Sequence, residues 1–197
     1  MTLEILLALA LFAGSTLFTP GPNNLMLMTS GANFGLRRTL PHLLGVALGF
    51  PLMILPVGLG VMELFDLWPP SYTLLKVLSV AYMLWLAWKI AHASAPKEAG
   101  VDARPLTFVQ AAAFQWVNPK AWSMALGAIT LYAASRDLTA VVTVAATYAT
   151  LGLVSAVFWT SLGTAVRRLL AQPRRLRAFN WTMAILLVGS MVPVLLG

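Results

Sequence analysis

The chain has 197 residues, of which 59% are hydrophobic and only 10% are charged. A water-soluble domain carries about 25% charged residues, so this composition excludes a water-soluble globular protein and predicts an all-α integral membrane protein. At about 20 apolar residues per span, the length suits six transmembrane helices in a single domain, residues 1–197. The chain has no cysteine, which excludes disulfides, cysteine-bound metals and a cysteine nucleophile.

The first apolar segment covers about residues 2–30 and contains a break. Glu4 stands where a secretory signal peptide would carry positive charge, so we expect the segment to be retained as a span. Pro20, Gly21 and Pro22 interrupt its helix, because proline removes a backbone donor and clashes with the preceding turn. In hydrocarbon, the freed backbone groups must be satisfied by protein or by a water-filled cavity. This segment therefore predicts a helix that ends or breaks beside a cavity.

The second span follows a basic loop at residues 31–39, and Pro41 opens it at a tolerated first-turn position. Gly45 and Gly49 have the Gly-x-x-x-Gly spacing that lets another helix approach closely. That helix could belong to the same chain or to a second copy in a homodimer.

The third span covers about residues 72–91, after an acidic loop at 63–70. The longest polar stretch, residues 92–106, then separates two half-repeats at about 1–91 and 107–197. This division predicts three spans in each half.

The second half contains spans at about residues 107–132, 139–166 and 178–196. Its first span has a proline break, as the first span of the chain does. With three spans per half, the halves are expected to be inverted repeats in which helices 1 and 4 are broken. Small residues on one face of the fifth span predict a packing seam: Ala145, Ala149, Gly152 and Ala156.

Basic residues gather in the first, third and fifth loops, which indicates membrane orientation rather than nucleic-acid binding. These loops hold ten Lys and Arg, against two in the second and fourth loops with their span edges. The positive-inside rule places the ten in the cytoplasm and both termini on the periplasmic side. The fifth loop is also expected to bind anionic lipid headgroups. The ten residues are Arg37, Arg38, Lys89, Lys97, Arg104, Arg167, Arg168, Arg174, Arg175 and Arg177.

Lys120 lies near the middle of the fourth span, within the break formed by Asn118 and Pro119. A cation at that depth costs about 2.5–3.5 kcal/mol on insertion scales, so it usually faces a cavity and has a partner. The spans offer no Asp or Glu near mid-membrane, so an anionic ligand could fill that role. Alternatively, Lys120 is structural and binds carbonyl groups freed by a broken helix, or snorkels to the interface.

Asn23, Asn24 and Asn118 supply amide donors and acceptors at the two breaks. They could hold the ammonium and carboxylate of a ligand, with the dipole of a half-helix after Pro22 directed at the carboxylate. Alternatively, the amides cap the broken helices and touch no ligand. Two broken spans in corresponding halves indicate a transporter binding site, so we expect both breaks to meet at one cavity.

Proton coupling is not assigned by the sequence, because the buried carboxylate that many carriers use is missing. His42 lies at a span start and is expected to be structural, whereas a buried lysine such as Lys120 could lose its proton. An intramembrane enzyme is disfavoured, because two isolated histidines without cysteine or central carboxylates provide no catalytic group or metal cluster. A cation channel is disfavoured by a buried lysine. A metal or other small-ion exporter stays open as an alternative, although metal ligands are scarce, and no cofactor is expected.

Two motifs resemble the LysE/RhtB family of amino-acid exporters: Thr19-Pro20-Gly21-Pro22-Asn23-Asn24 in the first span and Asn118-Pro119-Lys120 in the fourth. The similarity covers essentially the whole chain, and segments 82–91 and 114–118 are most similar to the cysteine/O-acetylserine exporter branch. The resemblance implies a bacterial inner-membrane protein that exports amino acids or their derivatives from the cytoplasm, driven by a proton or ion gradient. A small amino-acid-like substrate and H⁺ are then the expected partners, with Asn23, Asn24, Asn118 and Lys120 around a zwitterion.

Overall fold

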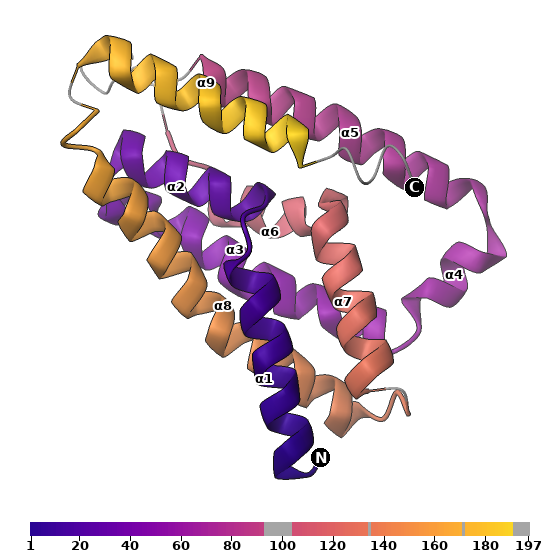
Figure 1. Ribbon diagram of the computed structural model, residues 1–197. Helices are drawn as coiled ribbons and strands as arrows, with labels where there is room; N and C mark the ends of the chain where they lie inside the picture. Colours follow the sequence, from indigo (N-terminus) through magenta and orange to yellow (C-terminus); the bar gives the residue numbers. More distant parts are fainter. Residues whose placement is uncertain (93–103, 134, 171, 191–197) are drawn as a thin grey trace.

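The computed structural model describes residues 1–92, 104–133, 135–170 and 172–190, and these residues form helices joined by short connections (Figure 1). No strand occurs among them, which confirms the all-α prediction. In chain order the helices are α1 (Leu3–Phe18), α2 (Pro22–Phe34), α3 (Leu36–Gly58), α4 (Val61–Leu67), α5 (Pro70–Ala91), α6 (Phe108–Phe114), the 3₁₀ turn η1 (Gln115–Val117), α7 (Pro119–Tyr132), α8 (Leu138–Val166) and α9 (Pro173–Gly189).

Most helices begin at a residue suited to that position. Proline opens α2, α5, α7 and α9, where the missing backbone donor costs nothing because the first N–H groups of a helix have no partner in the helix. Side chains cap other starts: Asp137 accepts a hydrogen bond from the backbone N–H of Ala140 at α8, and Thr107 forms a capping box with Gln110 at α6.

Helix α8 packs against α1, α2 and α3 and runs along the left side of the molecule in Figure 1. Helices α5 and α9 lie side by side and cover α2. Two clusters of buried apolar side chains result. One joins α2, α3, α5, α6, α8 and α9, and the other joins α1, α3, α7 and α8.

Helices α2 and α8 cross at two glycines, Gly31 and Gly163. A Cβ atom on Gly163 would lie 2.0 Å from the carbonyl oxygen of Met28, and one on Gly31 would lie 2.2 Å from that of Thr160. Neither position has room for a side chain, so this close approach of two backbones depends on glycine.

The face formed by Gly45 and Gly49 packs against α6 of the same chain. A Cβ on Gly45 would lie 2.4 Å from the carbonyl oxygen of Phe108, and one on Gly49 would lie 2.5 Å from the Cα of Ala112. The close partner is thus a helix of the monomer, and this face is not available to a second copy.

Three helices are long and apolar enough to cross a membrane by themselves: α3, α5 and α8. Helices α1 and α2 pass the same test as a pair, bent by 55° at the predicted first break, which gives up to four candidate spans. The predicted fourth span is divided into α6, η1 and α7, and α9, which has 17 residues, overlaps the predicted sixth span only over residues 178–189. Within the described residues, several membrane-crossing helices are therefore supported, whereas six spans in inverted halves are not established.

Two predicted loops were wrong. The loop at 31–39 does not exist, because α2 continues to Phe34 and α3 begins at Leu36. Gly35 alone joins them with φ of 78°, a conformation that glycine adopts without strain. Pro41 consequently lies inside α3 instead of opening it. The acidic loop at 63–70 holds the short helix α4, and most of the predicted loop at 92–106 lies outside the described residues.

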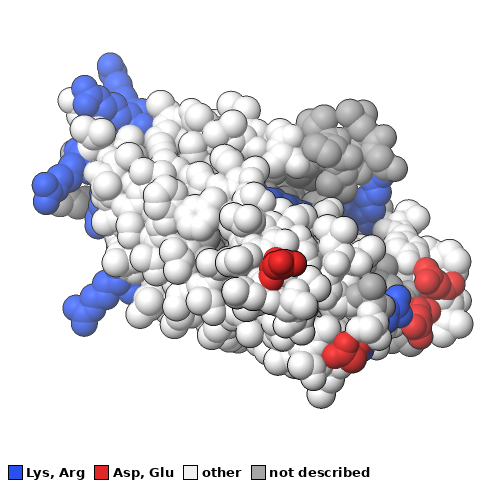
Figure 2. All heavy atoms as spheres, turned by 60° about the horizontal axis from the view of Figure 1, so that its bottom comes forward, with Lys and Arg blue, Asp and Glu red and all other residues white. Residues whose placement is uncertain are grey.

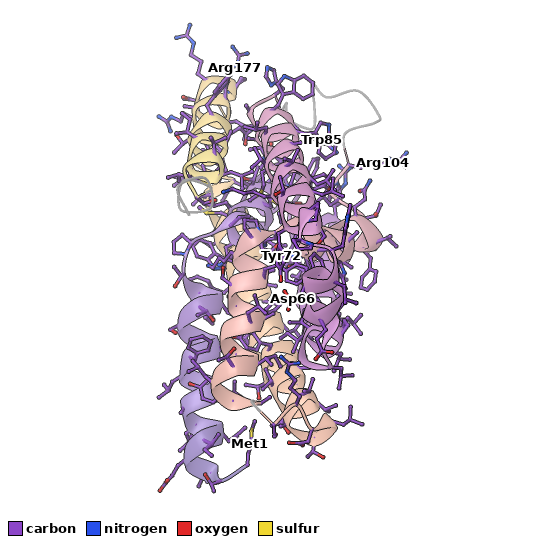
Figure 3. All side chains as sticks on the ribbon, turned by 90° about the vertical axis from the view of Figure 1, so that its right-hand side faces the viewer. Met1, Asp66, Tyr72, Trp85, Arg104 and Arg177 are labelled. Atoms are coloured by element: carbon purple, nitrogen blue, oxygen red, sulfur yellow. The ribbon has the colours of Figure 1, made fainter. Side chains whose placement is uncertain are left out.

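Charge is distributed unevenly along the molecule. In Figure 2 most of the visible Lys and Arg atoms lie at the left end, whereas the visible Asp and Glu side chains lie over the middle and the right-hand end, where some Lys and Arg atoms also lie. In Figure 3, Arg177 and Met1 lie at opposite ends of the molecule. The basic connection between α8 and α9 and the amino terminus thus lie far apart, as they must if they face opposite sides of a membrane.

Replacing Gly163 by alanine is expected to destabilise the protein by about 1–3 kcal/mol, because the added methyl group forces the backbones of α2 and α8 apart. Thermal unfolding of the purified protein in detergent measures this change. The matched control is Gly14→Ala in α1, where no atom lies within 4 Å of the added Cβ. Equal midpoints for the two variants would contradict the close crossing.

Candidate functional site

The two helix breaks meet at Lys120. Helix α1 ends at Phe18 and α7 begins at Pro119, and the Nζ atom of Lys120 donates a hydrogen bond of 2.6 Å to the carbonyl oxygen of Thr19. Gly21 makes room for this lysine, because a Cβ at that position would lie 2.7 Å from the Cδ atom of Lys120. The two motifs that the sequence singled out are therefore in direct contact.

Carbonyl groups at the end of α1 collect donors from three other helices. The carbonyl oxygen of Leu17 accepts from Nδ2 of Asn24 at 2.7 Å and from Oγ of Ser155 at 2.9 Å. That of Thr19 accepts from Nδ2 of Asn24 at 2.9 Å as well as from Lys120. A broken helix leaves its last carbonyl groups without partners in the helix, and here α2, α7 and α8 supply the replacements.

Asn23 forms a reciprocal amide pair with Gln115. Its Nδ2 donates to Oε1 of Gln115 at 2.9 Å, and Nε2 of Gln115 donates to its Oδ1 at 3.2 Å. Gln115 also donates to the carbonyl oxygen of Ala111 at 2.9 Å and is completely buried. Asn118 has a local role, since its Oδ1 accepts from the backbone N–H of Lys120 and caps α7.

A cavity of about 40 Å³ lies between these groups and the core. All four predicted binding residues line it, as does Gly21 from the predicted break. Its opposite wall is apolar and includes Leu27, Val46, Phe50 and Met124. In this conformation the cavity holds only a few water molecules. The lining residues are Thr16, Leu17, Gly21, Asn23, Asn24, Leu27, Val46, Ala47, Phe50, Asn118, Lys120, Ala121, Met124, Gly152, Ser155 and Ala156.

Helix dipoles and Lys120 give the polar wall of the cavity one electrostatically negative region and one positive region. The end of α1 presents the negative pole of its dipole. The start of α2, which no side chain caps, and the start of α7 with Lys120 present positive poles. None of the lining residues is an Asp or Glu. The cavity thus offers acceptors for an ammonium group and donors for a carboxylate.

Lys120 and Asn24 satisfy carbonyl groups of the broken helix, which is the structural role that the sequence left open. Their contact with a substrate stays a prediction. Sequence reasoning missed Gln115 and Ser155. Gln115 precedes Asn118 by one turn and could have been noticed as a polar residue beside the break, whereas nothing in the sequence distinguishes Ser155 from the other hydroxyl residues of α8.

Comparison with known proteins identifies the family. Residues 14–195 match the family described as LysE type translocator. The chain is 35% identical over 197 residues to the cysteine/O-acetylserine efflux proteins of Escherichia coli strain K12 and Shigella sonnei strain Ss046, covering 98% of this chain and 99% of each relative. No solved structure matches the chain. The resemblance drawn from the two break motifs is thereby confirmed, including the cysteine/O-acetylserine branch.

The Asn23–Gln115 pair predicts a measurable coupling energy. Asn23→Ala leaves the buried amide of Gln115 with only its bond to Ala111, and Gln115→Ala leaves the half-buried amide of Asn23 without its two bonds to Gln115, each at a cost of about 1–3 kcal/mol. The double variant is expected to be more stable than the sum of the two single losses by about 1 kcal/mol. The free energy of unfolding, measured by heat or denaturant for the wild type, both single variants and the double variant, gives the coupling energy. Strictly additive losses would show that the pair does not couple.

Proposed function

The chain belongs to the family of LysE type translocators, and on that premise we propose that it exports a small amino acid or amino-acid derivative from the cytoplasm. The relatives' printed names direct the proposal to cysteine and O-acetylserine, and they do not favour a metal or small-ion exporter. We place the protein in a bacterial inner membrane, with the proton gradient as the driving force. The observation that carries the site assignment is the bond between Lys120 and Thr19, which joins the two breaks at one cavity.

A zwitterion fits the poles of this cavity. Its carboxylate binds Lys120 and the uncapped N-terminus of α2, and its ammonium group donates to the carbonyl oxygen of Thr19 that Lys120 releases. The substrate side chain then faces the apolar wall. The chemistry of both poles is common to all α-amino acids, so selectivity among them resides in the shape of the apolar wall.

A cavity of about 40 Å³ has room for only a few water molecules, so substrate binding requires a wider conformation than this one. For a substrate to enter the cavity, the hydrogen bond between Lys120 and the carbonyl oxygen of Thr19 must break. A bound substrate gives each of these two groups a new partner. Its carboxylate accepts a hydrogen bond from Lys120, and its ammonium group donates one to the carbonyl oxygen of Thr19. The bent pair α1–α2 and helix α7 are the elements that must separate.

We assign the spans as two inverted halves: the α1–α2 pair, α3 and α5, followed by α6–α7, α8 and α9. Both termini lie in the periplasm and the arginine-rich connection between α8 and α9 lies in the cytoplasm. The separation of Arg177 from Met1 in Figure 3 and the positive-inside rule support this assignment.

Efflux of preloaded labelled amino acids tests the function and Lys120 together. Cells that express the protein are expected to export cysteine or O-acetylserine from a panel that also includes threonine, homoserine, leucine, lysine and arginine. Lys120→Met should reduce the rate at least tenfold, which corresponds to about 1.4 kcal/mol of lost substrate interaction. Lys76→Met, an identical change at an exposed lysine of α5, should leave it unchanged.

Membrane levels of both variants must match the wild type. Export by Lys120→Met at the wild-type rate would assign this lysine a structural role alone. Export of no amino acid by the wild type would overturn the proposed substrate class.

The orientation in the membrane can be tested by labelling single introduced cysteines, because the chain has no native cysteine that would also react. Thr2→Cys, at the exposed cap of α1, is expected to react with a membrane-impermeant maleimide added to intact cells. Gln172→Cys, at the exposed start of α9, should react only after the cells are opened. The reverse labelling pattern would invert the assigned topology.

A further inference from the structure

The side chain of His42 is buried in α3 without a hydrogen-bond partner. It is 2% exposed, and neither Nδ1 nor Nε2 binds any group within residues 1–92, 104–133, 135–170 and 172–190. Buried polar atoms nearly always have partners, and each one left unsatisfied costs about 1–3 kcal/mol. Trp159 also has a buried N–H group without a partner, but an indole does not change its charge. His42 is thus a titratable group that no contact of the fold explains.

His42 lies next to the candidate site along α3. Val46, one helical turn further on, lines the cavity. In the other direction, His42 is about 9 Å along the helix axis from Leu36, where α3 begins at the basic end of the molecule. The imidazole therefore lies between the cavity and the end that we assign to the cytoplasm.

Within the described residues, the elements packed against α3 contain no other histidine. Helices α2 and α6 and the turn η1, which pack against α3, contain no titratable residue. The carboxylates of the neighbouring α4 follow the C-terminal end of α3, whereas His42 lies near its N-terminal end. The titratable and charged residues of the remaining neighbouring segments, including α3 itself, are Arg37, Arg38, Glu63, Asp66, Tyr72, Lys76, Tyr82, Lys89, Arg104, Lys120, Tyr132, Tyr148 and Arg167, whose guanidinium group lies beside Gly35 at the start of α3.

We propose that His42 is the residue that binds and releases the coupling proton of export. This inference rests on the proposed function and replaces the structural role that the sequence suggested for His42. Histidine is the side chain that ordinarily titrates between pH 5 and 8. In the part of the chain that the structure describes, neither ring nitrogen of His42 forms a hydrogen bond, so either could take up a proton. An N–H bond forms when a proton arrives through water from the periplasmic side and breaks when the proton leaves to the cytoplasm, so no co-reactant is needed.

Burial links this proton to a conformational change. A neutral imidazole fits the packed conformation of the structure, whereas an imidazolium among apolar side chains without a counter-charge is costly. Protonation therefore favours a conformation in which water reaches His42, and release of the proton favours the packed one. Because the ring lies one turn from the cavity wall, the rearrangement that hydrates it also opens the substrate site.

Transport by the purified full-length protein in liposomes separates substrate movement from proton coupling. Exchange of labelled for unlabelled O-acetylserine requires the substrate site but no net proton movement, whereas transport driven by an imposed pH gradient requires both. His42→Gln is expected to keep exchange within about twofold of the wild type and to lose gradient-driven transport at least tenfold. Its rate should also lose the pH dependence that we expect of the wild type.

The control is His92→Gln, which removes the other histidine of the chain from an exposed position at the end of α5. It should behave as the wild type in both assays. His42→Asn replaces the Gln variant if that protein does not reach the membrane.

Three results would overturn the proposal. Gradient-driven transport by His42→Gln at the wild-type rate would remove the proton role, and a parallel loss of exchange and driven transport would make His42 structural. Wild-type transport without proton flux, measured with a pH dye inside the liposomes, would exclude proton coupling whatever the variants do. By contrast, a wild type that exchanges no amino acid at all would contradict the proposed function itself.

Discussion

The arrangement around the cavity depends on the carbonyl groups that the break after α1 leaves without partners. In a bilayer these groups cannot rely on water, so the fold must bring donors to them. Asn24, Ser155 and Lys120 supply those donors from α2, α8 and α7. One backbone interruption thereby fixes the relative positions of four helices and places their polar groups at a single point of an otherwise apolar molecule.

The glycine contacts set the distances that this convergence requires. Gly31 and Gly163 let α2 and α8 touch backbone to backbone, and Gly45 and Gly49 do the same for α3 and α6. Hydrogen bonds of under 3 Å between side chains and carbonyls of different helices are possible because the helices approach so closely. The apolar packing and the polar site are therefore consequences of the same close approach.

The sequence predicts the site residues that are unusual in a membrane-spanning helix, and it does not predict the site residues that are common there. Prolines at Pro20, Pro22 and Pro119 and a cation at Lys120 are costly in a span, which is why they stand out. Ser155 and Gln115 are unremarkable in a helix, and only the fold brings them to the breaks. The junction at Gly35 was missed for a similar reason, because a reversal by one residue with positive φ has no pattern beyond a glycine among many.

The two roles considered for Lys120, structural support and substrate binding, become one role in a transporter that opens and closes. A hydrogen bond from a charged donor contributes about 1.5–3 kcal/mol, enough to hold the two breaks together when no substrate is present. A zwitterion offers each partner of this bond a replacement of the same kind, a carboxylate for the ammonium and an ammonium for the carbonyl. A ligand that lacks either charge leaves one of the two groups unsatisfied in an apolar environment. On the proposed function, the bond between Lys120 and Thr19 would therefore also restrict opening of the site to molecules with both charges of an amino acid.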